Sequence, residues 1–416
     1  MNKKKILLYA HYYYPDVAST GQLLTELAEE LATEFEVTVI CVVPSYSGKI
    51  DLAYKQEKYF YEKINGVSII RVRVPEFTKT EKVSRIKNIL AYFFGAIIAT
   101  IRLPKQDIVF TISQPPILGG LLGVIGKFLK KGKLIYNIQD FNPEQTRAVK
   151  YSKNTVVLNF AQSLDKLSTK YADQMVLVGR DMVGTLQERF KDENTPSYVL
   201  INNWIDEQTV IPLPDTHPRV VAFKQHYHLE NKFIISYSGN IGLYYDLENI
   251  MSIIKKFNDN ESIRFVFIGE GTVKEKLQDI VEKEQLTNVR FIPYQDKENL
   301  VYSLNAADAH WVVNAKGVKG ISVPSKVYGV MAVGKPILGI LEKESEARII
   351  IEQADCGYVV EPGDYQAVEN MLRAILQNKA AFKEKGIKGR LYLEKHFSKD
   401  TSIKKYKMMI DELIQK

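Results

Sequence analysis

The sequence contains little cysteine and no pattern that would bind a metal. Of its 416 residues only Cys41 and Cys356 are cysteines, and neither belongs to a Cys-x-x-Cys pair or a Cys/His cluster. The six histidines show no zinc spacing. These absences exclude a disulfide scaffold, argue against structural zinc and indicate a reducing compartment.

Three motifs that hold nucleotides or metal-bound diphosphates are also missing. Without Gly-x-x-x-x-Gly-Lys-Ser/Thr the chain is no P-loop ATPase, and without Gly-x-Gly-x-x-Gly after the first strand a nicotinamide dehydrogenase is disfavoured. No Asp-x-Asp pair is present, so the sequence predicts no metal site and no cofactor. A phosphate-bearing ligand would then need positive potential from a lysine and a helix N-terminus.

One hydrophobic run, Ile89–Ile101, is shorter than the ~20 residues that cross a bilayer, and basic residues lie on both sides of it. They are Lys79, Lys82, Arg85, Lys87, Arg102 and Lys105, with Lys127, Lys130, Lys131 and Lys133 further on. The segment 79–105 therefore predicts a peripheral membrane contact, and a buried helix packed on a sheet is the alternative. The chain start has no cleavage site, which predicts a cytoplasmic protein on the inner face of the membrane. No nucleic-acid-binding motif accompanies the net charge of +7.

Short β-branched and aromatic runs alternate with helix-length segments along the whole chain, which predicts parallel sheets with crossover helices. The expected strands of a first series are 5–9, 36–43, 67–74, 107–112, 133–138 and 175–178. Those of a second series are 233–238, 263–268, 289–292, 309–313, 336–340 and 357–360. A proline-rich linker, 196–218, separates the series.

We therefore expect an α/β protein of two Rossmann-like domains, 1–203 and 204–397, with a C-terminal helix, 398–416, that returns to the N-terminal domain. Ligands of open α/β sheets bind at the carboxyl ends of the strands, so a cleft between the domains is the expected site.

The segment 320–336 reads as a loop that enters the N-terminus of a helix. Pro324 and Ser325 mark a turn and a cap, and Lys326 adds a positive charge beside the unpaired amides of the first helical turn. Such an opening can hold a phosphate. The alternative is an ordinary capped helix that joins two buried strands.

Glycine turns follow expected strands in both domains. Gly239-Asn240-Ile241-Gly242 and Gly269-Glu270-Gly271 follow strands of the second domain, and Thr20-Gly21-Gln22 opens the first helix of the first domain. Glycine lets a ligand approach the backbone, although most glycines at such positions serve the turn itself.

Polar residues also follow the strands of the first domain. Asp140 lies in Gln139-Asp140-Phe141-Asn142-Pro143-Glu144, directly after the strand 133–138, where a cleft residue belongs. An Asp that caps a turn before Pro143 is an equal alternative. His11, directly after the first strand, is a further cleft candidate.

Taken in order, these motifs resemble the retaining family 4 glycosyltransferases of the GT-B fold, nearest to bacterial enzymes that build capsule, exopolysaccharide and O-antigen units, including N-acetylfucosamine-type transferases. The resemblance covers nearly the whole chain. It rests on Tyr12-Tyr13-Tyr14-Pro15, Thr20-Gly21, Gln139-Asp140, Asn202-Asn203-Trp204, Ser238-Gly239-Asn240-Ile241-Gly242, Gly269-Glu270-Gly271, Val323-Pro324-Ser325-Lys326, Met331-Ala332 and Pro362-Gly363-Asp364.

The resemblance implies transfer of a sugar, an N-acetylated hexosamine, from a UDP-sugar to a polyprenyl-diphosphate-linked or glycan acceptor, without metal. It implies donor contacts from Gly239, Asn240, Gly242, Gly269, Glu270, Tyr294, Ser322, Ser325, Lys326 and Val327. On the acceptor side it implies His11, Thr20, Gly21, Gln22, Gln139 and Glu144. Lys326 and Asp140 are the expected catalytic residues.

The chain departs from the family pattern in its donor domain. Many members carry two glutamates where this chain has Ile321 and Gly329, and Asn240 stands in the place of an arginine. Lys326 would then carry more of the diphosphate charge. Two alternatives stay open: a non-hydrolysing UDP-sugar epimerase, and a GT-B subunit that binds a membrane or partner without catalysis.

Overall fold

The computed structural model describes residues 3–16, 18–78, 81–148, 154–191 and 193–415, so Lys79 of the predicted membrane segment lies outside the described residues. The chain divides into two compact units. The first unit comprises residues 1–202 and 402–416, and the second comprises residues 203–401. The domains expected from the sequence were 1–203 and 204–397, with the helix 398–416.

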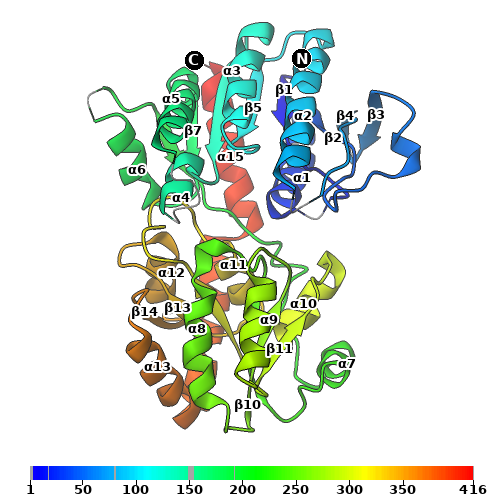
Figure 1. Ribbon diagram of the computed structural model, residues 1–416. Coiled ribbons are helices and arrows are strands. Elements are labelled where there is room, and N and C mark those ends of the chain that lie inside the picture. The colour runs from blue at the N-terminus through cyan, green and yellow to red at the C-terminus, as the bar shows by residue number, and fades with distance from the viewer. Residues whose placement is uncertain (1–2, 17, 79–80, 149–153, 192, 416) are drawn as a thin grey trace. The chain divides into compact units, whose positions relative to one another are not determined.

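The first unit contains an eight-stranded sheet in the order β3-β4-β2-β1-β5-β6-β7-β8 (Figure 1). The strands are β1 (Lys5–Tyr9), β2 (Glu36–Val42), β3 (Tyr59–Ile64), β4 (Val67–Val72), β5 (Ile108–Ile112), β6 (Lys133–Ile138), β7 (Gln174–Leu177) and β8 (Tyr198–Leu200). All neighbours pair in parallel except β3 and β4. The six predicted strands are confirmed within one or two residues, because their continuous apolar runs are typical of parallel strands buried on both faces.

Two strands of this sheet, β3 and β8, were not predicted. Both lie at an edge, and most of their side chains are half-buried or exposed. Edge strands bury less apolar surface, so their sequences lack the continuous hydrophobic run on which the prediction depended.

Helices connect these strands and pack against the sheet, and the last helix of the chain, whose first three residues belong to the second unit, joins them. They are α1 (Ser19–Ala32), the short 3-10 turn η1 (Leu52–Tyr54), α2 (Lys82–Arg102), α3 (Leu118–Lys130), α4 (Asn142–Ala148), α5 (Thr155–Tyr171), α6 (Met182–Arg189) and α15 (Lys399–Gln415). In α15, red in Figure 1, the Tyr406 phenol accepts a hydrogen bond of 2.6 Å from the Asn137 amide of β6. This contact ties the end of the chain to the first sheet.

Helix α2 is longer than the apolar run that predicted it. It begins at Lys82, so Lys82, Arg85 and Lys87 lie within the helix rather than before it. Its 21 residues are long and apolar enough to cross a membrane, which corrects the expectation of a segment that is too short. A third of its most apolar stretch is buried in the protein (33%), and core helices of soluble proteins meet the same criterion, so length and composition alone are weak evidence for a span.

The second unit contains a six-stranded, fully parallel sheet in the order β11-β10-β9-β12-β13-β14. The strands are β9 (Phe233–Ser238), β10 (Ile263–Ile268), β11 (Val289–Ile292), β12 (Ala309–Val313), β13 (Ile337–Ile340) and β14 (Gly357–Val360). The six strands predicted for this region are confirmed, with β13 beginning one residue later than expected.

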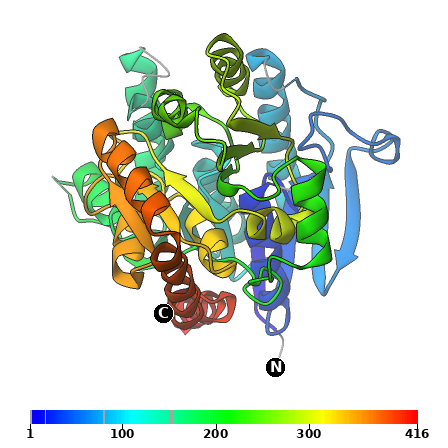
Figure 2. The ribbon, with the colours of Figure 1, turned by 90° about the horizontal axis from the view of Figure 1, so that it is seen from below.

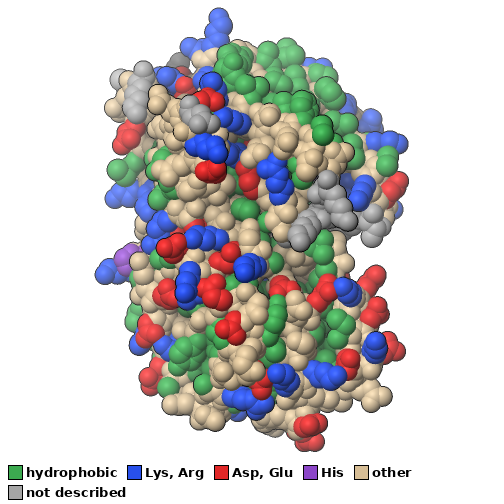
Figure 3. All heavy atoms as spheres, turned by 60° about the vertical axis from the view of Figure 1, so that its left-hand side comes forward, with side chains coloured by type: hydrophobic (Ala, Val, Ile, Leu, Met, Phe, Trp, Pro, Cys, Tyr) green, Lys and Arg blue, Asp and Glu red, His purple; other side chains and the backbone are tan. Residues whose placement is uncertain are grey.

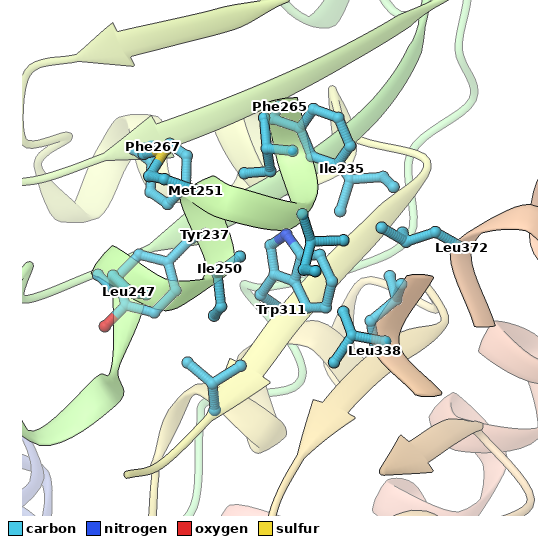
Figure 4. Packing of buried hydrophobic residues seen from close by; sticks show 14 of the residues in the cluster. Ile235, Tyr237, Leu247, Ile250, Met251, Phe265, Phe267, Trp311, Leu338 and Leu372 are labelled. Atoms are coloured by element: carbon cyan, nitrogen blue, oxygen red, sulfur yellow. The ribbon is translucent and has the colours of Figure 1, made fainter. Parts of the chain in front are cut away.

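Helices cover both faces of this sheet (Figure 2). They are α7 (Pro218–His226), α8 (Leu247–Ile254), α9 (Lys274–Lys283), α10 (Lys297–Asn305), α11 (Lys326–Ala332), α12 (Glu346–Ala354), α13 (Tyr365–Gln377) and α14 (Lys379–His396), with 3-10 turns η2 (Leu243–Tyr245) and η3 (Lys255–Phe257). Alternate strand residues face the two helical layers. Trp311 lies in one of these cores among Ile235, Leu338 and Leu372 (Figure 4).

Candidate functional site

The carboxyl ends of β9 and β10 carry the two glycine turns, and these turns pack backbone to backbone. The amide of Ile241 donates to the Glu270 carbonyl at 2.9 Å. A Cβ atom on Gly269 would lie 2.1 Å from the Gly239 oxygen, and one on Gly271 would lie 2.1 Å from the Ile241 oxygen. Only glycine fits at Gly269 and Gly271, because the neighbouring turn already occupies the space that a side chain would need.

Lys326, the first residue of α11, lies against the Gly239 turn. A Cβ atom on Gly239 would lie 2.7 Å from the Lys326 Cε, and Gly239 has a φ of +136°. The Lys326 Nζ lies 4.1 Å from the ring centre of Tyr245 and 4.8 Å from that of Tyr237. The lysine thus lies against a glycine turn and close to two aromatic rings, whose attraction for the ammonium group offsets part of the cost of its burial.

The electrostatics of Lys326 are unusual for a lysine. Desolvation lowers its pKa to about 7. Within the described part of the chain no carboxylate forms an ion pair with its ammonium group, and the two tyrosine rings are its charge contacts. A half-buried cation without a protein counter-charge is well suited to an anionic ligand.

The start of α11 is less open than the sequence predicted. Ser325 makes no capping hydrogen bond with its side chain. The amide of Val327 donates to the Pro324 carbonyl and that of Tyr328 to the Ser325 carbonyl, both at 3.2 Å. The expected set of unpaired first-turn amides is therefore wrong for these two groups, because the turn before the helix bonds them itself. The Val327 side chain is buried in the core, so only its backbone borders the turn.

A residue that sequence reasoning missed orders the loop before α11. The Glu342 Oε2 accepts hydrogen bonds from the amides of Gly317, Val318 and Lys319, at 2.9, 3.1 and 3.0 Å. This carboxylate fixes the loop that leads to Ser322, which is half-buried. Its position two residues after β13, at the carboxyl edge of the sheet, was the signal that could have identified it.

The other predicted donor residues surround the same sheet edge. Asn240 is exposed, and its amide nitrogen lies 2.8 Å from the position of a Cβ on Gly242. Glu270 pairs with Lys274 at 2.7 Å and is mostly exposed. Tyr294 lies two residues beyond β11, with 47% of its surface exposed. The structure thus brings the glycine turns and Lys326 into contact, with Tyr294 further along the edge.

His11 follows β1 in the first unit and is buried. Desolvation lowers its pKa to about 4, so the imidazole is neutral at pH 7. Its ring lies 4.4 Å from that of Tyr12 and 5.0 Å from that of Tyr92. Its Nε2 atom has no hydrogen-bond partner among the described residues. It is a buried polar atom that a ligand hydroxyl could satisfy.

Thr20, Gly21 and Gln22 form the first turn of α1. The Thr20 hydroxyl donates to the Gln114 side chain at 2.9 Å. A Cβ atom on Gly21 would lie 2.9 Å from the Tyr12 carbonyl oxygen, so this glycine lets α1 approach the segment that follows β1.

The turn after β6 is organised by Ser113. The amides of Gln139 and Asp140 lie 3.0 and 3.2 Å from the Ser113 hydroxyl oxygen, and the Asn142 amide group donates to the Ser113 carbonyl at 2.7 Å. Asp140 is half-buried at the carboxyl edge of the first sheet. This is the edge at which His11 also lies.

Glu144 is engaged in an internal ion network. Its two oxygens accept bonds of 2.7 and 2.6 Å from Arg189, which also donates to Asp165 at 2.6 Å. Arg189 lies 4.4 Å from the Phe141 ring centre, and the Tyr136 hydroxyl donates to Asp165 at 2.6 Å. Glu144 thus has a structural partner, and its acceptor contact stays a prediction.

Among the residues that the structure describes, no group of three or more His, Cys, Asp and Glu side chains could hold a metal ion.

Known proteins resemble this chain in sequence. Residues 220–389 match the model of the family described as glycosyl transferases group 1. The chain is 26% identical over 347 residues to "Probable glycosyltransferase WbjE" of Pseudomonas aeruginosa, covering 82% of this chain and 84% of that protein. It is 23% identical over 411 residues to "Putative colanic acid biosynthesis glycosyl transferase WcaI" of Escherichia coli, covering 97% and 98% of the two chains.

Solved structures resemble it in fold. Sucrose-phosphate synthase of Thermosynechococcus elongatus aligns with a TM-score of 0.78 at 14% identity, covering 99% of this chain and 100% of that one. HepE of Anabaena, solved with UDP-glucose, aligns with a TM-score of 0.71 at 12% identity, covering 98% and 99%. WaaG, a glycosyltransferase involved in lipopolysaccharide biosynthesis, aligns with a TM-score of 0.68 at 12% identity, covering 96% of this chain and 98% of that one.

The two parallel sheets and these neighbours define a protein of the GT-B fold. The family match over its second unit and the named relatives identify the protein as a glycosyltransferase, with a group 1 segment in that unit. This outcome favours glycosyl transfer over the epimerase and the non-catalytic subunit.

Proposed function

We propose that the protein is a retaining, metal-independent glycosyltransferase of surface-polysaccharide synthesis, of the N-acetylfucosamine-transferase type. It moves an N-acetylated hexosamine from a UDP-sugar to a polyprenyl-diphosphate-linked or glycan acceptor. The named relatives support this direction, since WcaI is described for colanic acid and WaaG for lipopolysaccharide biosynthesis. HepE, which shares the fold, was solved with UDP-glucose.

The observation that carries the proposal is Lys326 above the Gly239 turn. The cation lies at the carboxyl edge of the second sheet, held by Tyr237 and Tyr245. A UDP leaving group develops negative charge as its bond to the sugar breaks, and a preorganised cation in a poorly hydrated site stabilises that charge. Lys326 would do this in place of the arginine that Asn240 replaces.

The proposed chemistry needs no protein base on the donor side. The bond between the anomeric carbon and the diphosphate oxygen breaks, and the acceptor oxygen bonds to the anomeric carbon on the same face. The leaving phosphate oxygen takes the proton of the acceptor hydroxyl, so charge and atoms balance. We assign Asp140 to the acceptor side, where it orients that hydroxyl, and neutral His11 to a hydrogen bond with the acceptor.

We also propose that the segment 79–105 contacts the inner face of the cell membrane. Its described part, helix α2, carries a line of exposed apolar residues at helical spacing. These are Val83, Ile86, Leu90, Phe94, Ile98 and Ile101. Exposed apolar side chains on the helix face that also carries Lys87 suit the interface of an anionic bilayer.

The function is tested by turnover. The protein is incubated with a panel of UDP-sugars and a polyprenyl-diphosphate-linked saccharide in the presence of EDTA, and the product anomer is assigned by NMR. We expect UDP release, a lengthened glycan and a retained anomeric configuration with an N-acetylated hexosamine donor. Absence of transfer from every UDP-sugar would reject the proposal, and an inverted product would reject its retaining mechanism.

A further inference from the structure

A basic hollow of about 450 Å³ lies in the first unit, at the amino ends of the strands. Its lining comes from the residues at the start of β1, β5, β6 and β7, from the end of α3 and from the end of α15. The lining side chains are those of Lys4, Lys105, Asp107, Lys127, Phe128, Lys131, Lys133, Asp173, Leu413 and Ile414, beside the backbone of Gly132. Because His11 and Asp140 follow the carboxyl ends of β1 and β6, this hollow is separate from the candidate acceptor residues.

The charges in this hollow do not balance. Five lysines face two aspartates, and both aspartates are already occupied. Asp107 accepts a backbone bond from Lys5 at 2.8 Å and lies 3.7 Å from the Lys4 ammonium. Asp173 accepts a backbone bond from Leu134 at 2.7 Å and pairs with Lys127 at 2.8 Å.

Three lysines remain unpaired. Lys105, Lys131 and Lys133 form no ion pair with any residue that the structure describes. Lys131 also adopts the left-handed conformation, with a φ of +54°, at the position after α3 where glycine is the usual residue. The hollow therefore presents positive charge that the protein itself does not neutralise.

The ends of nearby helices do not explain these three lysines. Helix C-termini attract cations because their last carbonyls are unpaired. Here Lys130 donates to the carbonyls of Ile101 and Leu103, at 3.2 and 2.6 Å, and Lys127 donates to that of Tyr171 at 2.9 Å. Lys127 and Lys130 therefore bond the carbonyls near the helix ends. Lys105, Lys131 and Lys133 are not needed for that purpose and can bind an anionic ligand.

The rim of the hollow is apolar and exposed. Phe128, which lines the hollow, exposes 59% of its surface. Leu129 follows it on α3, and the carbonyl of Ile101 accepts a hydrogen bond from Lys130 of the same helix end; both side chains are also exposed. Phe128 packs edge-on against Tyr171, with ring centres 5.5 Å apart. Hydrophobic side chains gather at one end of the first unit, with Lys and Arg side chains around them (Figure 3). A free phosphate would leave this rim in water, whereas a phospholipid would cover it with acyl chains.

We propose that this hollow binds the phosphate headgroup of an anionic phospholipid, with Lys105, Lys131 and Lys133 around the phosphate and Phe128, Leu129 and Ile101 at acyl-chain depth. The site fixes which end of the first unit faces the bilayer. It deepens the membrane contact proposed above and rests on it, but it is independent of UDP-sugar transfer.

Flotation with vesicles tests the site on the full-length protein. One set of vesicles is phosphatidylglycerol mixed with phosphatidylcholine, and the other is phosphatidylcholine alone. We expect the triple variant Lys105→Gln, Lys131→Gln, Lys133→Gln to partition onto the anionic vesicles ~10²-fold more weakly than the wild type. The control is Lys63→Gln, Lys283→Gln, Lys395→Gln, which removes the same charge from exposed lysines outside the hollow. It should stay within about threefold of the wild type.

Equal partitioning of the two triple variants would overturn the headgroup site while leaving the membrane contact of α2 in place. Failure of the wild type to float would overturn both. A second pair of variants checks the rim: Phe128→Ser with Leu129→Ser should weaken binding about tenfold, and Leu52→Ser with Val156→Ser, also exposed, should not. Circular dichroism and thermal unfolding of each variant confirm that it folds.

Two further readouts distinguish a phospholipid site from a site for free anions and from the donor site. Inorganic phosphate should release no more protein from the vesicles than chloride of equal ionic strength. Greater release would mean that the hollow takes a free anion, and would overturn the lipid assignment. Calorimetric titration of the wild type with UDP reports on the donor site alone, so a failure of the proposed function is seen independently of flotation.

Discussion

Each unit contains a largely parallel sheet with polar residues at its carboxyl edge. The two units differ in whether their buried cation has a counter-charge within the protein. In the first unit the buried cation Arg189 is paired with two carboxylates, those of Glu144 and Asp165. In the second unit Lys326 is held by aromatic rings alone among the described residues. A cation paired inside the protein cannot be removed without leaving buried charge unpaired, whereas a cation without a counter-ion is available to a ligand. This difference supports the proposal that the charged donor binds to the second unit and an uncharged hydroxyl of the acceptor to the first.

The largest effect should come from breaking the network of the first unit. Replacing Arg189 with Met leaves Glu144 and Asp165 with uncompensated buried charge, at a cost of ~3–5 kcal/mol. Urea unfolding, followed by a probe in the first unit, measures this loss. Lys191→Met, which breaks an exposed pair with Glu188, is the control and should cost less than ~1 kcal/mol. A similar loss in both variants would contradict the structural role of the network.

The next largest effect should come from Lys326, the cation of the second unit that has no counter-ion among the described residues. Lys326→Met removes the charge that faces the diphosphate, so UDP affinity and kcat/KM should fall ~10²-fold, with the fold retained. Lys326→Arg keeps the charge and should recover part of the loss. Lys283→Met on α9 is the matched control. Calorimetry with UDP and initial rates give the measurement, and wild-type values for the Met variant would remove Lys326 from the donor site.

Weakening the hydrogen bonds that hold the loop before α11 should have a smaller effect. Glu342→Gln loses the charge-assisted part of three bonds to the amides of Gly317, Val318 and Lys319. The loop is then less well ordered before Ser322, and KM for the donor should rise about tenfold, while kcat changes less. Glu344→Gln, at an exposed position of the same region, should leave KM unchanged. Equal effects of the two substitutions would show that Glu342 has no special role.

The sequence predicted twelve of the strands because buried parallel strands are continuous apolar runs, and it predicted the glycine turns because they follow those strands. It could not predict why glycine is needed at Gly269 and Gly271. The backbone that leaves no room for a side chain there belongs to the neighbouring turn, about 30 residues away in the chain. Glu144 illustrates the same limit, since its partner Arg189 lies on another helix. The resemblance named Lys326 and Gly239 as donor contacts, but the packing of Lys326 against the Gly239 turn, Tyr237 and Tyr245 joins separate elements that only the fold brings together.

The smallest expected effect is a pH dependence that distinguishes the two units. The pKa of Lys326 is lowered to about 7, and a bound diphosphate raises the pKa again because it favours the charged amine. Binding of UDP should then take up ~0.9 proton at pH 8 and ~0.1 at pH 6, and affinity should fall ~10-fold as pH rises from 6 to 8. Tyr237 and Tyr245 face the amine, but burial raises the pKa of Tyr237 well above its ordinary value, so that ring stays neutral over this range. Calorimetry in buffers of different ionisation enthalpy measures the uptake, and Lys326→Met gives the background from UDP itself.

His11 provides the contrast in the first unit. Its pKa of about 4 keeps it neutral from pH 6 to 8, so acceptor affinity should not change over that range. Equal pH dependence for UDP and for the acceptor would contradict the proposal that Lys326 faces the donor diphosphate while neutral His11 faces the acceptor.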